Sequence, residues 1–198
     1  MSFQTIFEIQ QSMTVNNRRM VGQQVTRSGY ITVAQYLTAV PWVFTITPHN
    51  YLYYPQVRSI IQAIDNKDRQ LPEVISFASD NLSWFLEMQG TATAATLNGT
   101  PAANTQTLNL TSNGTFKAGD FIMIDGYTYK ITADSAGSTV GIHRPLIGTP
   151  TSGTTVYIGE QCTFNVVAEK CPTYTLNPMT DGAFVQWDDA FVFREYIT

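Results

Sequence analysis

Apolar and polar positions alternate along most of the chain, and this period of two predicts β-strands. In "PWVFTITP" the side chains of Trp42, Phe44 and Ile46 fall on one side of such a strand, between two prolines. The same pattern predicts strands in further segments: "TIFEIQQSMTV", "GYITVAQYL", "EVISFAS", "SWFLEMQ", "CTFNVVAEKCPTYTL" and "AFVQWDDAFVFREYI".

One segment, residues 55–66, has the period of a helix instead. Val57, Ile60, Ile61 and Ile64 recur at the i, i+3, i+4, i+7 spacing, and a proline stands in the first turn. This apolar stripe is expected to pack against a sheet.

The composition changes after Gly90. No charged side chain occurs between Met88 and Phe116, where Thr, Ala, Asn and Gly dominate. A structureless linker of this length is uncommon inside a compact chain, and Leu108 and Leu110 alternate with polar neighbours. The segment is therefore predicted to form two short strands and turns.

The stretch "FKAGDFIMIDGYTYKI" has the strongest hairpin signal in the chain. The runs "FIMI" and "YTYKI" flank Asp125 and Gly126, which suit a two-residue turn with positive φ. Asp120 follows a glycine where the hairpin begins, and an Asx turn accounts for it. Both acids are thus explained by turns rather than by a metal or catalytic site. Two more strands are predicted in "STVGIHRPLIG" and "TTVYIGEQ".

These elements predict a mainly β fold. The body, residues 1–89 plus 160–198, is expected to be a β-sandwich or partly closed barrel with one packed helix. Residues 90–159 are expected to form an inserted small antiparallel β domain between two glycines.

The composition adds an expectation about partners. Charged residues make up only 13% of the 198 residues, and aromatic residues make up 12%. Such a surface favours burial against other subunits. A net charge of −4 offers no long-range attraction for nucleic acid. The chain shows no secretory signal and no apolar run of membrane-spanning length, so synthesis in the cytosol without membrane insertion is expected.

Candidate catalytic groups are few. The two histidines, His49 and His143, fall in different predicted subdomains. No nucleophile elbow, phosphate loop, metalloprotease motif or calcium loop occurs. Cys162 and Cys171 have no second pair to complete a zinc site. Two ordinary thiols are the preferred interpretation, with a disulfide or a metal role as the alternatives.

A pair of acids could act as the catalytic residues of a glycosidase, but their spacing does not indicate which two. The candidates are Glu73, Glu87, Asp188, Asp189 and Glu195. Asp188 and Asp189 beside Trp187 could also bind a sugar that stacks on the indole. A turn between two strands, with Trp187 in the core, is the preferred interpretation.

Three arginines, Arg18, Arg19 and Arg27, fall in the first turn region and the strand after it. They form either a solvated loop or bidentate pairs with carboxylates of a neighbouring subunit. Both interpretations stay open.

The order of segments resembles that of tail-tip and baseplate structural proteins of tailed bacteriophages. The similar stretches are "QSMTVNNRRMVGQQVTRSGYITVAQ", "PWVFTITPHNYLYYPQVRSIIQAI", "FKAGDFIMIDGYTYKI", "IHRPL", "CPTYTLNP" and "VQWDDAFVFREYI". The resemblance implies a tail-tube-like or distal-tail-like protein of the virion. Its copies would form a homo-oligomer, expected to be a hexameric ring, around a channel through which genome DNA only passes.

The inserted domain would contact neighbouring tail components. No catalytic residue, cofactor or bound metal is expected. A carbohydrate-binding β module for recognition of the host surface is the alternative function, since ten tyrosines and three tryptophans permit it.

Overall fold

The computed structural model describes residues 3–18, 21–25, 31–35, 40–49, 52–67, 71–135 and 137–198, and only the backbone of 21–25 and 31–35. The chain is a mainly β protein, which confirms the predicted fold class. Its internal contacts divide it into two compact units. The body unit comprises Met1–Asn16, Pro41–Phe85 and Thr163–Thr198, and the barrel unit comprises Asn17–Val40 and Leu86–Cys162.

The division predicted from sequence, with residues 90–159 as an insertion, corresponds only in part to these units, because 17–40 groups with the barrel unit. The inserted domain, residues 90–159, stays a prediction.

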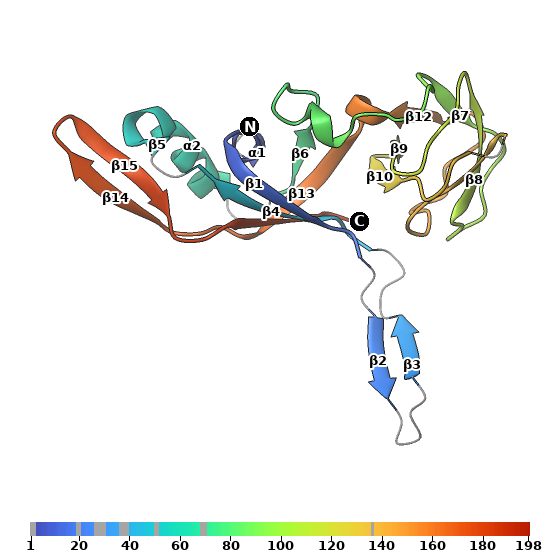
Figure 1. Cartoon of the computed structure of the whole chain (residues 1–198), viewed down its shortest axis with the longest axis horizontal. Helices are drawn as coiled ribbons and strands as arrows, with labels where there is room; N and C mark the ends of the chain where they lie inside the picture. Colours follow the sequence, from blue (N-terminus) through green and yellow to red (C-terminus); the bar gives the residue numbers. More distant parts are fainter. Residues whose placement is uncertain are drawn as a thin grey trace. The chain divides into compact units, whose positions relative to one another are not determined.

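The centre of the body unit is an antiparallel five-stranded sheet (Figure 1). Its strands lie in the order β1 (Gln10–Asn16), β4 (Val43–Pro48), β16 (Phe191–Glu195), β13 (Thr163–Lys170) and β6 (Glu73–Ser76). The alternation predicted for β4 is confirmed, since Trp42, Phe44 and Ile46 are buried. Phe44 lies opposite Phe193 of β16, and both are fully buried. The core of this unit is thus largely aromatic.

A helix, α1 (Phe3–Glu8), covers this aromatic face, so the strand predicted for residues 5–9 is wrong. Phe3, Ile6 and Phe7 recur at helical spacing and are fully buried. The ring of Phe7 packs edge-on against that of Phe44, with 5.6 Å between the centroids. The helix buries four of its six side chains, those of Phe3, Gln4, Ile6 and Phe7.

The side chain of Glu73 fixes the start of α1. This buried carboxylate on β6 accepts hydrogen bonds from the backbone N–H groups of Phe3, at 3.3 Å, and Gln4, at 3.2 Å. Lys67 forms an ion pair with the same carboxylate. The amide of Gln4 in turn bonds the backbone N–H and C=O of Ser76. Contacts with residues about 70 positions away therefore select the helix.

The predicted helix is confirmed as α2 (Tyr54–Lys67). It packs on a second sheet, whose strands lie in the order β14 (Tyr174–Met179), β15 (Gly182–Trp187) and β5 (Leu52–Tyr53). Val57 and Ile61 of the helix form an apolar cluster with Val185 of β15. Figure 1 shows β14 and β15 to one side of the five-stranded sheet, with α2 and β5 beside them.

The strand predicted in "SWFLEMQ" is wrong. The segment contains a short 3₁₀ helix, η1 (Ser83–Phe85), and the N–H groups of Leu82 and Ser83 both bond the carbonyl of Ser79. Phe85 then packs against Phe77, with ring centroids 5.3 Å apart.

The barrel unit contains an antiparallel six-stranded sheet that curls until its outer strands meet (Figure 1). The order is β10 (Tyr127–Lys130), β9 (Phe121–Ile124), β12 (Thr155–Ile158), β7 (Ala95–Leu97), β8 (Thr107–Ser112) and β11 (Thr139–Gly141). Ile131 pairs with Ile142 just beyond β10 and β11, and the N–H of Thr132 bonds the carbonyl of Gly141 at 3.0 Å. The predicted alternation of Leu108 and Leu110 is confirmed, since both point into this core.

Two further strands, β2 (Val21–Val25) and β3 (Ile31–Gln35), form an antiparallel hairpin. Sequence alternation predicts β3 but not β2. Among the helices that the structure describes, none has both the length and the apolar character that crossing a bilayer requires.

Candidate functional site

Asp120 serves as a structural carboxylate rather than as a free acid. It is fully buried and accepts hydrogen bonds from three backbone N–H groups: Lys117 at 2.7 Å, Gln89 at 2.7 Å and Gly90 at 3.1 Å. The predicted Asx turn is wrong, because the Asp120 side chain bonds the N–H of Lys117, three residues earlier, and not an N–H later in the chain. The other two bonds tie the hairpin to the segment at which the composition changes, and the sequence gives no sign of them.

The predicted turn between β9 and β10 is confirmed. Asp125 has φ 50° and Gly126 has φ 80°, and Ile124 pairs with Tyr127. Positive φ at both central positions is the geometry that favours Asp-Gly in tight hairpins.

The two histidines lie in different units. His49 is exposed in the body unit, just after β4. In the barrel unit, the Nδ1 of His143 accepts a hydrogen bond from the backbone N–H of Lys130 at 3.0 Å. His143 therefore helps to join β10 to the end of β11.

The acids that were considered as a glycosidase pair do not come together at one site. Glu195 accepts a hydrogen bond from the backbone N–H of Trp42 at 3.0 Å, whereas Glu73 holds α1 as described above. Glu87 is exposed and belongs to the barrel unit. Within the described ranges, no three His, Cys, Asp or Glu side chains come close enough to hold a metal ion.

Asp188 and Asp189 form the predicted turn between β15 and β16. Asp188 accepts hydrogen bonds from the hydroxyl groups of Thr173, at 2.6 Å, and Thr175, at 3.2 Å. A hydrogen bond from Lys170 and one from a backbone N–H lower the pKa of Asp189 below its ordinary value. Both carboxylates therefore bind their own turn and its neighbours.

The two cysteines are not joined by a disulfide. Cys162 is fully buried, and its thiol lies 3.7 Å from the carbonyl of Tyr157. Burial raises the pKa of this thiol far above its ordinary value. Cys171 is half-buried in the body unit.

Of the three arginines proposed for contacts between subunits, Arg18 is exposed just after β1. Arg19 and Arg27 lie outside the described residues. Both interpretations of the three arginines, a solvated loop and pairs with carboxylates of a neighbouring subunit, stay open.

The hairpin β2–β3 is a sheet of its own. Val21 pairs with Gln35 and Val25 with Ile31, and neither strand pairs with any other strand of the described chain. An isolated two-stranded hairpin is marginally stable in water. Its outer edges carry backbone groups that can pair with another chain.

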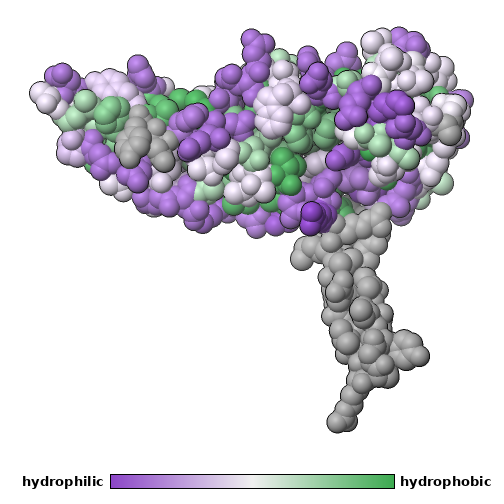
Figure 2. Space-filling view, in the orientation of Figure 1, coloured by the Kyte–Doolittle hydropathy of each residue, from purple (hydrophilic) through white to green (hydrophobic). Residues whose placement is uncertain are grey.

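Two edge strands of the body unit also carry exposed apolar side chains. Val74 on β6 is 57% exposed, and Leu176 and Met179 on β14 are 41% and 45% exposed. Figure 2 shows hydrophobic residues as small patches among hydrophilic ones on the visible face. Apolar side chains on open edges favour contact with other chains.

A polar groove of about 500 Å³ lies beside α1 and β1 in the body unit. Trp84 of η1 is 56% exposed at its wall, and its indole N–H bonds the carbonyl of Asn81 at 2.9 Å. The buried Oε1 of Gln10 has no hydrogen-bond partner among the described residues. The remaining lining residues are Glu8, Gln11, Ser12, Met13 and His49.

The sequence does not single out Trp84, because the strand-like composition of its segment hides the break. The turn-forming "SDN" just before it is the signal that could have revealed the 3₁₀ helix.

The chain matches no protein-family model, and a search of the curated proteins finds no match.

Proposed function

We propose that this protein is a structural subunit of a bacteriophage tail tip or baseplate, forming a ring around the central channel. The observation that carries the proposal is the hairpin β2–β3, which pairs with no other described strand. Because such a hairpin is marginal on its own, it is stabilised best by a neighbouring subunit or tail component. Its task is contact rather than catalysis.

The edges of the body unit support the same proposal. β6 and β14 each end a sheet, and each carries exposed apolar side chains. A ring needs two different, complementary surfaces on each subunit, because its contacts are head-to-tail. Two open edges and a hairpin supply candidates for such surfaces.

The sequence adds two further supports. The chain has a low charged fraction, 13%, as expected for a subunit that buries much of its surface. Its segment order resembles that of tail-tip and baseplate proteins. On this proposal the protein is made in the cytoplasm of the host bacterium and resides in the virion as a hexameric ring that continues the tail tube.

The test is cryo-electron microscopy of particles that contain the chain. We expect six copies around the channel, with the hairpin of each copy against a neighbouring chain. Single copies at the ends of fibres would contradict the ring. Solution mass alone is a weaker test, since a ring subunit can stay monomeric until its partner is present.

A second candidate function, carbohydrate binding, is favoured by the groove at Trp84. An exposed indole offers an apolar platform for a sugar ring, and amide, carboxylate and imidazole groups around it offer donors and acceptors. Binding of the purified chain to a glycan array, lost in Trp84→Ala and kept in Trp187→Phe, would support this function. No binding to any glycan would exclude it for the glycans displayed.

A further inference from the structure

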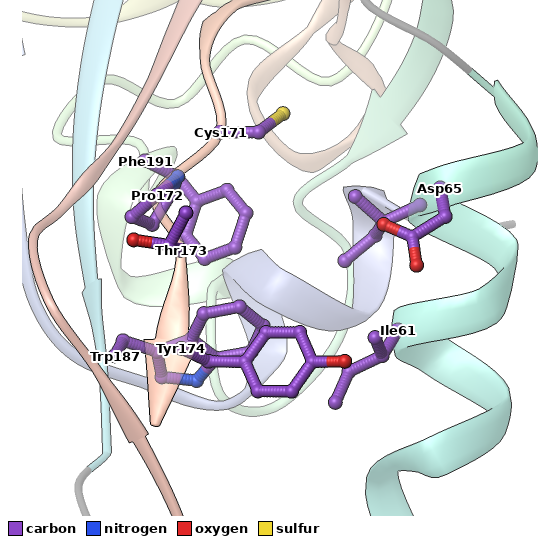
Figure 3. A pocket seen from close by; sticks show the side chains of 9 residues that line it. Ile61, Asp65, Cys171, Pro172, Thr173, Tyr174, Trp187 and Phe191 are labelled. Carbon is purple, nitrogen blue, oxygen red and sulfur yellow. The ribbon is translucent and has the colours of Figure 1, made fainter. Parts of the chain in front are cut away.

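A second cavity, of about 370 Å³, lies in the body unit between the end of α2 and the ends of β14 and β15 (Figure 3). Its volume is at the small end of the range of about 300–1,000 Å³ that is usual for ligand pockets. A cavity of this size suits a single side chain or a molecule of similar size.

Aromatic rings form one wall of this cavity. The ring centroid of Trp187 lies 5.4 Å from that of Tyr174 and 4.9 Å from that of Phe191, with 69° between the planes in both pairs. Rings at steep angles to one another present both faces and edges to the space between them. Aromatic walls of this kind attract organic cations through the negative faces of the rings.

Asp65 supplies negative charge on the opposite side. Figure 3 shows its side chain on α2, across the cavity from Thr173 and Phe191. Asp65 is the only charged residue among the described residues that line the cavity, and it forms no ion pair with another described residue.

The position of Asp65 on the helix adds to this. It lies in the last turn of α2, where the negative end of the helix dipole disfavours a carboxylate. Lys67, in the same turn, forms its ion pair with Glu73 instead. A cation bound beside Asp65 would therefore offset the repulsion between this carboxylate and the negative end of the helix dipole.

The indole N–H of Trp187 needs an acceptor. Its Nε1 atom is buried and has no hydrogen-bond partner among the described residues. Buried indole N–H groups usually have one. The aromatic wall of the cavity therefore contains one buried donor without a partner among the described residues.

We propose that this cavity binds an arginine side chain on an exposed segment of a partner protein. The planar guanidinium stacks on aromatic rings and pairs with a carboxylate through two hydrogen bonds, which suits this wall and Asp65 better than a lysine ammonium does. This proposal is independent of the proposed ring of subunits, since a partner protein that carries the arginine can bind a monomer equally well.

The test uses two small probes of the same shape, N-acetyl-arginine N-methylamide and the uncharged N-acetyl-citrulline N-methylamide. Each is titrated into the ¹⁵N-labelled full chain, and the indole N–H signal of Trp187, assigned with Trp187→Phe, is followed by NMR. We expect a saturable shift with the arginine probe and an affinity about fivefold or more above that for citrulline. Equal affinities, or a signal that neither probe moves, would overturn the proposal.

Two matched variants test the role of the charge. Asp65→Asn should reduce the preference for arginine to about twofold or less, because the carboxylate is lost and the shape is kept. Asp181→Asn removes an exposed acid outside the cavity and should leave the preference unchanged. If Asp65→Asn keeps the full preference, Asp65 is not the counter-charge and the proposal fails.

Discussion

Arg144 donates a hydrogen bond through Nη1 to the carbonyl oxygen of Val40, 2.7 Å away, although 104 positions separate the two residues in the chain. The guanidinium is fully buried. Its Nη2 donates to the carbonyl of Thr128 at 2.9 Å, and the group lies 5.0 Å from the ring centroid of Tyr129. Backbone carbonyls and an aromatic face thus solvate a buried positive charge and hold residue 40 in the barrel unit.

The first prediction follows from this arrangement. Arg144→Met keeps much of the side-chain length but leaves the carbonyl oxygens of Val40 and Thr128 without this donor. We expect the free energy of unfolding to fall by about 3 kcal/mol, measured by urea denaturation. Lys130→Met, which replaces an exposed cation in the same unit, should change it by about 0.5 kcal/mol or less. Equal effects of the two substitutions would show that Arg144 is not essential to the packing.

The second prediction concerns the turn between β9 and β10. Asp125→Ala should lower stability by about 1 kcal/mol, because alanine tolerates the φ of 50° poorly. Asn tolerates this conformation, so Asp125→Asn should be close to neutral in the same denaturation experiment. A loss of equal size in both variants would assign the effect to the carboxylate rather than to the backbone.

The third prediction distinguishes the two thiols. Burial raises the pKa of Cys162, so this thiol should stay protonated and unlabelled by iodoacetamide in the folded protein at pH 8. Cys171 is half-buried and should react. We expect one labelled thiol per folded chain and two after unfolding, by mass spectrometry. Cys171→Ser should abolish labelling of the folded protein, whereas Cys162→Ser should leave it.

The raised pKa of Cys162 also determines whether its contribution to stability rises or falls with pH. A pKa raised in the folded state means that the folded chain holds this proton more tightly than the unfolded chain. The contribution of Cys162 is therefore fully present below the ordinary thiol pKa of about 8.5 and is lost as pH rises above it. Cys162→Ala should flatten the decline in stability between about pH 8 and pH 10. A decline that is unchanged in this variant would have another origin.

The fourth prediction tests whether residues 91–158 form an insertion. A methyl group added at Gly159 would lie 2.8 Å from Met88 Cγ and 3.2 Å from the carbonyl oxygen of Leu86, so the two ends of the segment lie side by side. A short Gly/Ser linker in place of 91–158 should leave a soluble β body, because the cost of closing a loop depends only weakly on its length. Loss of the β signal in circular dichroism would show that the segment is part of the main core.

Sequence patterns correctly predicted the elements that depend mainly on residues close to one another in the chain. The spacing of Val57, Ile61 and Ile64 predicts α2, and Asp125 with Gly126 predicts the tight hairpin; the structure contains both. The alternation in β4 was also predicted, because every second side chain of this strand is apolar and is buried in the structure.

Elements that depend on distant partners were not predictable in this way. The first turn of α1 is bonded by Glu73, and Asp120 bonds the N–H groups of Gln89 and Gly90 about 30 positions away. A period of two in residues 5–9 predicts a strand, and only tertiary contacts overrule it. The grooves were missed for the same reason, since Trp84 and Gln10 meet only in the folded chain.

The order of strands in the body sheet also limits when this unit can fold during synthesis. β16 lies between β4 and β13, yet it follows every other strand of the sheet in the chain. β1 and β4 therefore remain separated from β13 and β6 until the ribosome has released β16. The strands of the curled sheet lie within Leu86–Cys162 and are complete earlier. Late closure across such sequence separations makes folding of the body slow and exposes its aromatic strands to aggregation in the meantime.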